Sequence, residues 1–189
     1  MSEVFNPAVD NSGEPAVTDR VPVGSDMYNR IVEFLYDEAA LLDNLQLNEW
    51  AKCFTEDIVY QAPVKVTHTR SDKKKKGRPM MHLFENHESM MLRIFRIEDT
   101  NVAWAEEPSS RTRRLITNVI VHKTERENEY DVTSYFLVTR NRFEQHDYQL
   151  MSGKRMDRWR LVDGELKLAR RIIDLDMSVL SMPNLAIFF

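Results

Sequence analysis

One face of the segment from residue 25 to about residue 44 carries apolar residues at helical spacing. Its members, which include one acid, are Met27, Ile31, Phe34, Leu35, Glu38 and Leu42. Ser25 is placed as an N-cap, and Asp26 suits the first turn because the helix dipole favours negative charge there. The pattern predicts an amphipathic helix. The apolar positions that follow predict a short second helix: Leu47, Trp50, Ala51 and Phe54.

Shorter and more mixed patterns come next. Asp57 opens an apolar, β-branched run to Val64, which predicts a strand that Pro63 stops or places at an edge. Residues 65–79 hold seven Lys and Arg, which favours a solvated loop over a ligand-binding one. A third helix from about 86 to 98 is marked by Phe84, His87, Met91, Ile94 and Phe95.

From residue 111 the spacing changes to the two-residue alternation of strands. Four consecutive strands are predicted, at 111–122, 130–143, 148–162 and 166–175, with Asp163-Gly164 as the hairpin turn between the last two. In the first strand, one face is expected to carry Leu115, Thr117, Val119 and Val121, and the other Ile116, Asn118 and Ile120. Because both faces hold apolar residues, this strand is predicted to be central in its sheet.

This order of elements predicts an α+β fold with a largely antiparallel sheet and helices covering one face. A long, curved sheet around a helix makes a cone, whose inside is either a pocket or a filled core. Residues 25–189 are expected to form this single domain, and residues 1–24, rich in Pro, Gly, Asp, Glu and Ser, an extended or mobile N-terminal arm. The tail from 179 to 189 is apolar, so Phe188 and Phe189 must be covered by this domain or by a partner, which favours an oligomer.

Composition narrows the classes of function. A chain of 189 residues suits one domain, and its net charge of −4 argues against nucleic acid as a partner, because phosphate binding depends on positive surface. No apolar run reaches the roughly 18–20 residues that span a bilayer, and the N-terminus lacks the features of a signal peptide. Cys53 is the one cysteine, so an internal disulfide is impossible and a reducing compartment is favoured. We expect a cytoplasmic protein that contacts neither a membrane nor nucleic acid.

Residues that bind metals, clusters or nucleotides are not arranged in the usual patterns. The five histidines form no His-Glu-x-x-His motif. An iron–sulfur cluster needs at least two cysteines even in its mixed His/Cys form, and the chain has one. The five glycines form no Gly-x-Gly phosphate loop. The chain is therefore expected to hold no catalytic, cofactor-binding or metal-binding residues.

One enzymatic option survives, a general acid/base pair inside the cone. Its candidates are Tyr36, Asp37, Asp57, Tyr60 and His122, since a histidine can titrate near neutral pH. In the interpretation that we favour, Asp37 is a solvated helix residue, Asp57 caps the entry to a strand, and His122 ends a strand near solvent.

The stretch from Trp104 to Val119 places three arginines where a loop becomes a strand. Arg111 and Arg113 are expected on one side of the strand and Arg114 on the other, so they do not form a single anion clamp. Arginine suits ion pairs at interfaces, which favours pairing with acids such as Glu106 or with acids of a neighbouring chain. The residues expected at a subunit interface are Trp104, Glu106, Arg111, Arg113, Arg114, Asn118, Phe188 and Phe189.

The same stretch carries a longer motif. Pro108–Val119 is close to a sequence pattern of a known protein family, Pro-Ser-Arg-Thr-Arg-His-Leu-x-x-Asn-Val. Ser109 stands where a second proline is usual and Arg114 where histidine is usual, so a hydrogen bond specific to that histidine does not carry over. Further motifs are Glu38–Asp43 followed by Trp50, Asp57–Tyr60, Trp104–Glu106, Arg171–Asp176 and the closing Asn184-Leu185 with terminal phenylalanines. With these, the chain from about residue 26 onward resembles the small (β) subunit of aromatic-ring-hydroxylating dioxygenases, the Rieske non-haem iron oxygenases.

The resemblance implies a cone-shaped domain similar to scytalone dehydratase and nuclear transport factor two. It also implies a structural, non-catalytic β subunit, with three copies joined to three large α subunits as α3β3. In that family, the α subunit holds the Rieske [2Fe–2S] cluster and the mononuclear Fe(II), and adds both atoms of O2 to an aromatic ring to give a cis-dihydrodiol. Electrons come from NAD(P)H through a separate reductase, often with a ferredoxin.

Two other functions are left open by the residues. One is a free-standing dehydratase or isomerase of the same fold, with an Asp/His pair such as Asp57 and His122 in the cone. The other is a plain binding module for small apolar ligands. The lack of cysteine and glycine motifs and the apolar tail favour the assembly subunit.

Overall fold

The computed structural model describes residues 19–65, 80–100, 109–142, 146–178, 180 and 186–189. Three helices and two strands come first: α1 (Asp26–Asp43), α2 (Leu47–Ala51), β1 (Phe54–Pro63), β2 (Met81–Asn86) and α3 (His87–Glu98). Four long strands follow: β3 (Arg111–Lys123), β4 (Glu129–Asn141), β5 (Gln149–Val162) and β6 (Glu165–Leu175). None of the described helices is long and apolar enough to cross a membrane.

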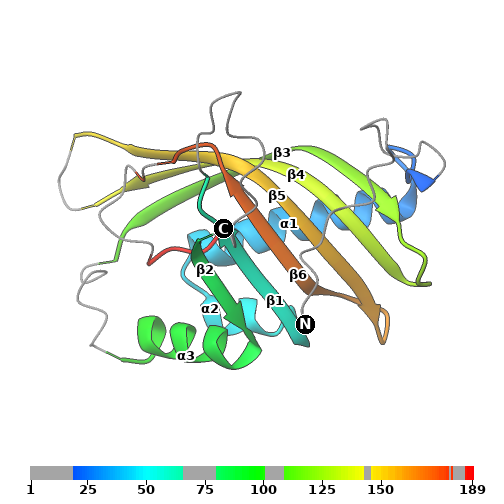
Figure 1. Ribbon diagram of the computed structural model, residues 1–189, viewed down its shortest axis with the longest axis horizontal. Coiled ribbons are helices and arrows are strands. Elements are labelled where there is room, and N and C mark those ends of the chain that lie inside the picture. The colour runs from blue at the N-terminus through cyan, green and yellow to red at the C-terminus, as the bar shows by residue number, and fades with distance from the viewer. Residues whose placement is uncertain (1–18, 66–79, 101–108, 143–145, 179, 181–185) are drawn as a thin grey trace.

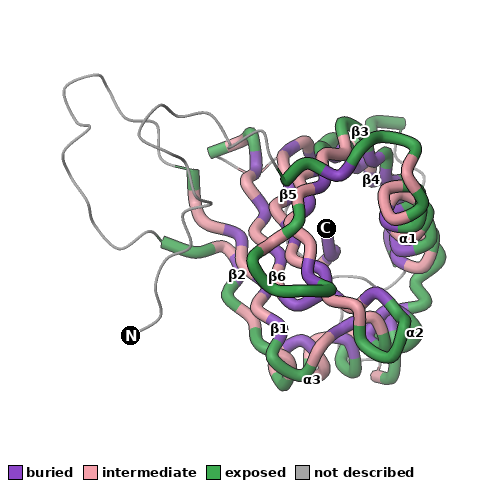
Figure 2. The backbone as a smooth tube through the Cα atoms, turned by 90° about the vertical axis from the view of Figure 1, so that its right-hand side faces the viewer, coloured by how far each residue is buried: buried purple, intermediate pink, exposed green. Residues whose placement is uncertain are grey.

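The six strands form one curved sheet in the order β2-β1-β6-β5-β4-β3. Neighbouring strands are antiparallel, except that β1 and β6 are parallel. In Figure 1, α1 runs beneath the long strands, while α2 and α3 lie below β1 and β2. Figure 2 shows the strands and helices surrounding an interior in which the C-terminus lies. The predicted α+β fold, with N-terminal helices packed on a mainly antiparallel sheet, is confirmed.

Helix α1 buries the stripe that the sequence predicts, with Ile31, Leu35 and Glu38 all turned inward. Ser25 occupies the N-cap position with extended backbone, but its hydroxyl donates to the Pro22 carbonyl at 2.8 Å and does not cap the helix. The apolar stripe, more than the cap, therefore positions α1 across the sheet.

Phe84 lies in a strand, β2, and not at the start of the third helix as predicted. Helix α3 begins at His87, after a reciprocal capping box in which the Ser89 backbone N–H donates to Asn86 Oδ1 at 2.9 Å and the Asn86 N–H to Ser89 Oγ at 3.0 Å. Phe54 likewise opens β1, although the sequence placed it in the second helix. Short apolar runs do not distinguish a strand from a helix turn, which explains both corrections.

Strand β3 lies at the edge of the sheet, not at its centre as predicted. Asn118 has a φ of 53°, a conformation that asparagine tolerates, and the register with β4 shifts there. Ile116 faces the interior before this bulge and Val121 faces it afterwards, so the expected alternation is broken. Leu115 and Val121 were predicted on one face and lie on opposite ones.

Other parts of the chain cover the outer edge of β3. Val21, in the described end of the expected arm, donates its N–H to a β3 carbonyl at 2.9 Å, and the Tyr28 hydroxyl donates to a second one at 3.2 Å. Asp43 accepts the backbone N–H of Arg114 at 2.9 Å. These contacts protect an edge that would otherwise invite strand pairing. Residues 1–18 of the arm lie outside the described residues.

Gly153 of β5 lies where the sheet leaves no room for a side chain. A Cβ at this position would lie 2.5 Å from the Asp174 backbone oxygen and 2.9 Å from the Phe136 ring. We expect Gly153→Ala to lower the free energy of unfolding by about 1–3 kcal/mol, because β5 and β6 must separate or Phe136 must move. Urea denaturation of the variant measures this, and an unchanged midpoint would contradict the close approach.

Candidate functional site

Four charged side chains are buried together inside the cone. Arg171 of β6 donates to both oxygens of Glu38 on α1, at 2.7 and 2.9 Å, and to both oxygens of Asp157 on β5, at 2.8 and 2.7 Å. Arg155 of β5 donates to Glu38 at 3.2 Å, and the Trp50 indole N–H donates to it at 3.0 Å. These four charged residues, Glu38, Arg155, Asp157 and Arg171, are called the buried network. It connects α1 to two central strands.

Glu38 and Arg171 are held in their charged forms by their neighbours in the buried network. Burial by itself raises the pKa of Glu38, but the charges of Arg171 and Arg155 and the hydrogen bonds from Arg171 and Trp50 outweigh it, so the pKa is lowered overall. Burial lowers the pKa of Arg171, yet Asp157 and Glu38 raise it well above its ordinary value. A carboxylate held in this way does not readily exchange protons with a substrate near neutral pH.

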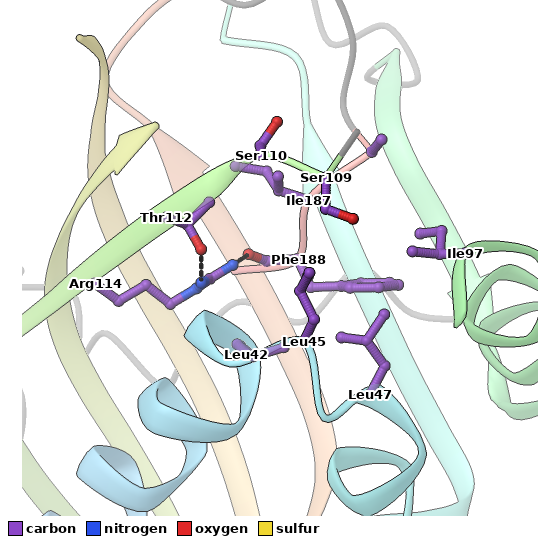
Figure 3. Close-up of a pocket in the computed structure, with 11 residues that line it drawn as sticks. Leu42, Leu45, Leu47, Ile97, Ser109, Ser110, Thr112, Arg114, Ile187 and Phe188 are labelled. Atoms are coloured by element: carbon purple, nitrogen blue, oxygen red, sulfur yellow. Dashed lines mark hydrogen bonds between the residues drawn. The ribbon is translucent and has the colours of Figure 1, made fainter. Parts of the chain in front are cut away.

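The last two residues lie beside the buried network. The Phe189 N–H donates to the Tyr60 hydroxyl at 2.8 Å, and the Phe189 backbone oxygen accepts from Tyr60 at 3.1 Å and from Arg171 at 2.6 Å. The Phe188 carbonyl accepts from Arg114 at 2.6 Å, as Figure 3 shows. These backbone groups of Phe188 and Phe189 are thus satisfied inside the chain.

The two phenylalanine rings fill the interior. Phe188 packs on Trp50 with ring centroids 4.8 Å apart, and the Arg93 guanidinium lies 4.8 Å from the Phe188 centroid. Phe189 packs on Phe136 at 5.6 Å. The cavity beside Phe188 in Figure 3 has a volume of only about 20 Å³, enough for about one water molecule. At this place the cone is a filled core, with no space for a substrate.

The proposed acid and base candidates do not converge inside the cone. Tyr36 and Asp37 are exposed on α1, and His122 lies half-buried near the end of β3. Asp57 is exposed and pairs with an arginine of β5 at 2.9 Å. Only Tyr60 is in the interior, where burial raises the pKa of a hydroxyl already bonded to the tail. The geometry therefore does not support an Asp/His pair in the cone.

Three residues expected at a subunit interface lie inside this chain instead. Arg114 is buried, forms an ion pair with Asp43 and donates to Thr112 Oγ1 at 3.0 Å. Phe188 and Phe189 are covered by the domain itself, so they give no support for an oligomer. Arginine stands here for the shorter histidine of the motif, and its length lets it reach both α1 and the tail.

The remaining interface residues divide into two groups. Arg111, Arg113 and Asn118 are exposed on β3, with Arg111 donating to Asn141 at 2.7 Å. Arg111 and Arg113 lie on the opposite side of the strand from Arg114, as predicted. Trp104 and Glu106 lie outside the described residues.

The outer face of the sheet carries an apolar surface next to these arginines. We call Leu115, Tyr135, Leu137 and Leu150 the outer patch; their exposed fractions are 49%, 49%, 39% and 51%. Leu115 of β3 is the direct partner of Leu137 of β4, and Leu150 of β5 pairs with the residue two positions beyond Leu137. The patch is therefore continuous across three strands, in the manner of a protein–protein contact surface.

A shallow groove extends the outer patch towards α1. It has a volume of about 370 Å³ and is lined by Tyr36 and Ala40 of α1 and by Arg113 and Leu115 of β3, among others. Tyr36 is 55% exposed. The groove therefore contains an aromatic residue, an arginine and apolar side chains, and protein–protein interfaces are enriched in aromatic residues and arginine.

A second cleft, of about 580 Å³, lies at the far end of the sheet and is lined by charged side chains. Arg158 pairs with Asp131 at 2.8 Å, and Arg160 pairs with Asp57 at 2.9 Å and Glu129 at 3.0 Å. These five charged side chains of the cleft are therefore paired within the chain.

No three His, Cys, Asp or Glu side chains within the described ranges come together as a metal site. Burial raises the pKa of the Cys53 thiol to about 11. A thiol that stays protonated at neutral pH is a poor metal ligand and a poor nucleophile.

The buried network was missed at the sequence level, although its signal is present. Glu38 appears in the apolar stripe of the first helix, and a lone acid at such a position must find a buried partner. On β5, Arg155 and Asp157 share the parity of the buried Met151 and Trp159. Strand parity could therefore have identified two of the partners.

Comparisons with known proteins agree on one family. The family model described as "Ring hydroxylating beta subunit" matches residues 37–182. The chain is 35% identical over 173 residues to benzene 1,2-dioxygenase subunit beta of Pseudomonas putida, covering 89% of this chain and 91% of the relative. It is 34% identical over 177 residues to biphenyl 2,3-dioxygenase subunit beta of Rhodococcus jostii (strain RHA1), covering 91% and 94%.

Solved structures share the fold. A chain of naphthalene 1,2-dioxygenase with indole bound in the active site superposes with a TM-score of 0.79 at 24% identity, covering 87% of this chain and 88% of that one. A putative scytalone dehydratase from Novosphingobium aromaticivorans superposes with a TM-score of 0.57 at 17% identity, covering 80% and 85%. At these identities, the likeness concerns the fold alone.

Glu38→Gln tests the buried network. The substitution keeps the shape but leaves Arg171 and Arg155 without a full counter-charge, so we expect the free energy of unfolding at pH 7 to fall by about 3–5 kcal/mol. Glu33→Gln, at an exposed position of the same helix, is the matched control and should change it by less than about 0.5 kcal/mol. Equal effects of the two variants in chemical denaturation would contradict the network.

The lowered pKa of Glu38 also predicts a pH dependence. The unfolded chain takes up a proton at the ordinary pKa of glutamate, about 4.3, before the folded chain does. The stability from this site is fully present above that pH and is lost as the pH falls through the folded-state pKa. Unfolding midpoints between about pH 5 and 3 should therefore fall more steeply in the wild type than in Glu38→Gln; parallel profiles would show that Glu38 is not held ionised.

Proposed function

Because the chain belongs to the family of ring-hydroxylating β subunits, we propose that it is the non-catalytic assembly subunit of its oxygenase. In this proposal, the complex adds both atoms of O2 to an aromatic ring and releases a cis-dihydrodiol. The observation that carries the proposal is the filled cone: the tail and the buried network occupy the space in which an enzyme of this fold would bind its substrate.

The residues of this chain do not fit a Rieske cluster, and those that the structure describes bring no three His, Cys, Asp or Glu side chains together to hold a mononuclear iron. A Rieske cluster needs two cysteines and two histidines, and the chain has one cysteine, whose thiol stays protonated. We therefore place the [2Fe–2S] cluster and the mononuclear Fe(II) in a large α subunit, which receives electrons from NAD(P)H through a separate reductase. A reducing compartment, the cytoplasm, suits the unpaired Cys53.

The outer patch and the neighbouring groove are the proposed contact with another subunit of an α3β3 complex. Four exposed apolar side chains are flanked by Arg111 and Arg113, an arrangement that combines an apolar centre with polar residues at its rim. The edge of β3 is already bonded to Val21, Tyr28 and Asp43. Docking therefore uses side chains of the outer face, and not addition of a strand to the sheet. Trp104, Glu106 and Asn118 remain part of this proposed interface.

A free-standing dehydratase or isomerase is the alternative. It would need proton-transfer groups facing one cavity; Asp57 lines the cleft at the far end of the sheet, and His122 is not among the residues that line that cleft. A binding module for small apolar ligands would need an open pocket, which the tail occupies. Neither alternative is favoured by a specific observation.

Leu115→Asp and Leu137→Asp test the docking surface. Each places a charge in the outer patch without disturbing the core, so we expect binding to the large subunit to weaken at least ~10-fold while the unfolding temperature of the isolated chain stays the same. Size-exclusion chromatography and titration calorimetry with the large subunit measure this.

Leu92→Asp is the matched control, because Leu92 is 67% exposed on α3, away from the outer patch. It should bind the large subunit as the wild type does. Equal loss of binding in all three variants, or no loss in the two patch variants, would remove the outer patch as the contact.

A further inference from the structure

The tail places an aromatic ring and an oxygen acceptor together inside the cone. The backbone oxygen of Phe189 accepts from the Arg171 guanidinium at 2.6 Å and from the Tyr60 hydroxyl at 3.1 Å, while its ring packs on Phe136. A cation and a hydroxyl at one end and an aromatic wall at the other are the features that recognise a ring joined to a carboxylate.

The groups that hold Phe189 are themselves held by the rest of the fold. Arg171 is fixed on both sides by Glu38 and Asp157, at distances of 2.7 to 2.9 Å. Tyr60 is fully buried on β1. The bonds of Arg171 to Glu38 and Asp157 do not involve the tail. The Arg171 guanidinium is therefore preorganised for whatever occupies the interior.

The interior also holds buried donors with unused capacity. Arg155 Nη2 and Trp159 Nε1 have no hydrogen-bond partner among the described residues. Both side chains are 1% exposed and face inward from β5, and the Arg171 guanidinium lies 5.9 Å from the Trp159 ring centroid. Unsatisfied buried donors are costly, and they indicate a place where an acceptor is accommodated.

We propose that the interior of the cone is a latent binding site for aryl carboxylates, which in this chain is occupied by its own Phe188 and Phe189. The site binds a single aromatic ring with an acid one to three bonds away, the carboxylate lying on Arg171 and Tyr60. The site is independent of the outer patch and of the proposed role in assembly.

The full-length double variant Phe188→Lys and Phe189→Lys tests the site. A lysine ammonium is costly to bury where the two phenylalanine rings now pack on Trp50 and Phe136, so the tail leaves the interior. The probe is 3-phenylpropionate, which carries the equivalents of the ring, Cβ, Cα and carbonyl carbon of Phe189 and ends in a carboxylate. We expect saturable binding in titration calorimetry, a higher unfolding temperature with the acid, and at least ~10-fold weaker binding of neutral 3-phenylpropionamide.

The matched control is Phe84→Lys with Phe95→Lys, two phenylalanines that are 62% and 53% exposed. Its tail stays in place, and it should bind neither probe. Equal binding of acid and amide to the folded tail variant, or no binding, would overturn the proposal. If the tail variant is unfolded alone, recovery of its circular dichroism by the acid and not by the amide supports the site, and recovery by neither overturns it.

Phe189→Ala gives a second, independent test in a chain that keeps its backbone oxygen on Arg171. Here only the ring position is vacated, so toluene should bind and raise the unfolding temperature, while 3-phenylpropionate should not. Binding of the acid but not of toluene would contradict the proposed orientation.

Discussion

The ion pair between Glu38 and Arg171 is the interaction on which the rest of this structure depends. Two charges in a protein interior are costly unless each meets its partner in good geometry. Here the guanidinium contacts Glu38, Asp157 and the last residue of the chain at once. Arg171 on β6 thereby holds together three segments that are far apart in sequence: α1, β5 and the tail. Sliding α1 along the sheet would break the pair, so the network also fixes how the helix crosses the strands.

Much of the fold follows from periodicity, and the exceptions have identifiable physical causes. The long helix, the four long strands and the hairpin at Asp163-Gly164 are strongly patterned, and the structure contains them. The six-residue strand β2 carries too little pattern to separate it from the helix that follows. Asn118 has a positive φ, and beyond it the residues of β3 alternate between the two faces of the sheet in the opposite order. The sequence of this edge strand therefore shows apolar residues on both predicted faces, as a central strand would. Backbone irregularities of this kind leave no periodic trace.

The site was less predictable than the fold. The expected acid and base residues are exposed or separated, because spacing along a chain does not show which residues a curved sheet brings together. Arg114 was expected to meet another subunit and instead binds Asp43 and the tail. The prediction that Phe188 and Phe189 must be covered was correct in its physics, and it is the domain itself that covers them. Predicting the buried network would have required two signals together: the parity of residues on β5 and the lone acid of the first helix.

In the proposed function, this chain acts through the outer face of its fold, because the interior is filled by its own side chains. The chain shares its architecture with a putative scytalone dehydratase, yet its own cone is closed by two phenylalanines and a balanced set of charges. On the outer face, the outer patch is exposed beside Arg111 and Arg113. The proposal is therefore that this chain helps to assemble the complex, while the large subunit carries out its chemistry. Iron content and arene turnover, determined for the purified chain, for its large subunit and for the two combined, test this most directly. The account predicts iron and turnover only in preparations that contain the large subunit; turnover or a bound redox centre in the purified chain alone would contradict it.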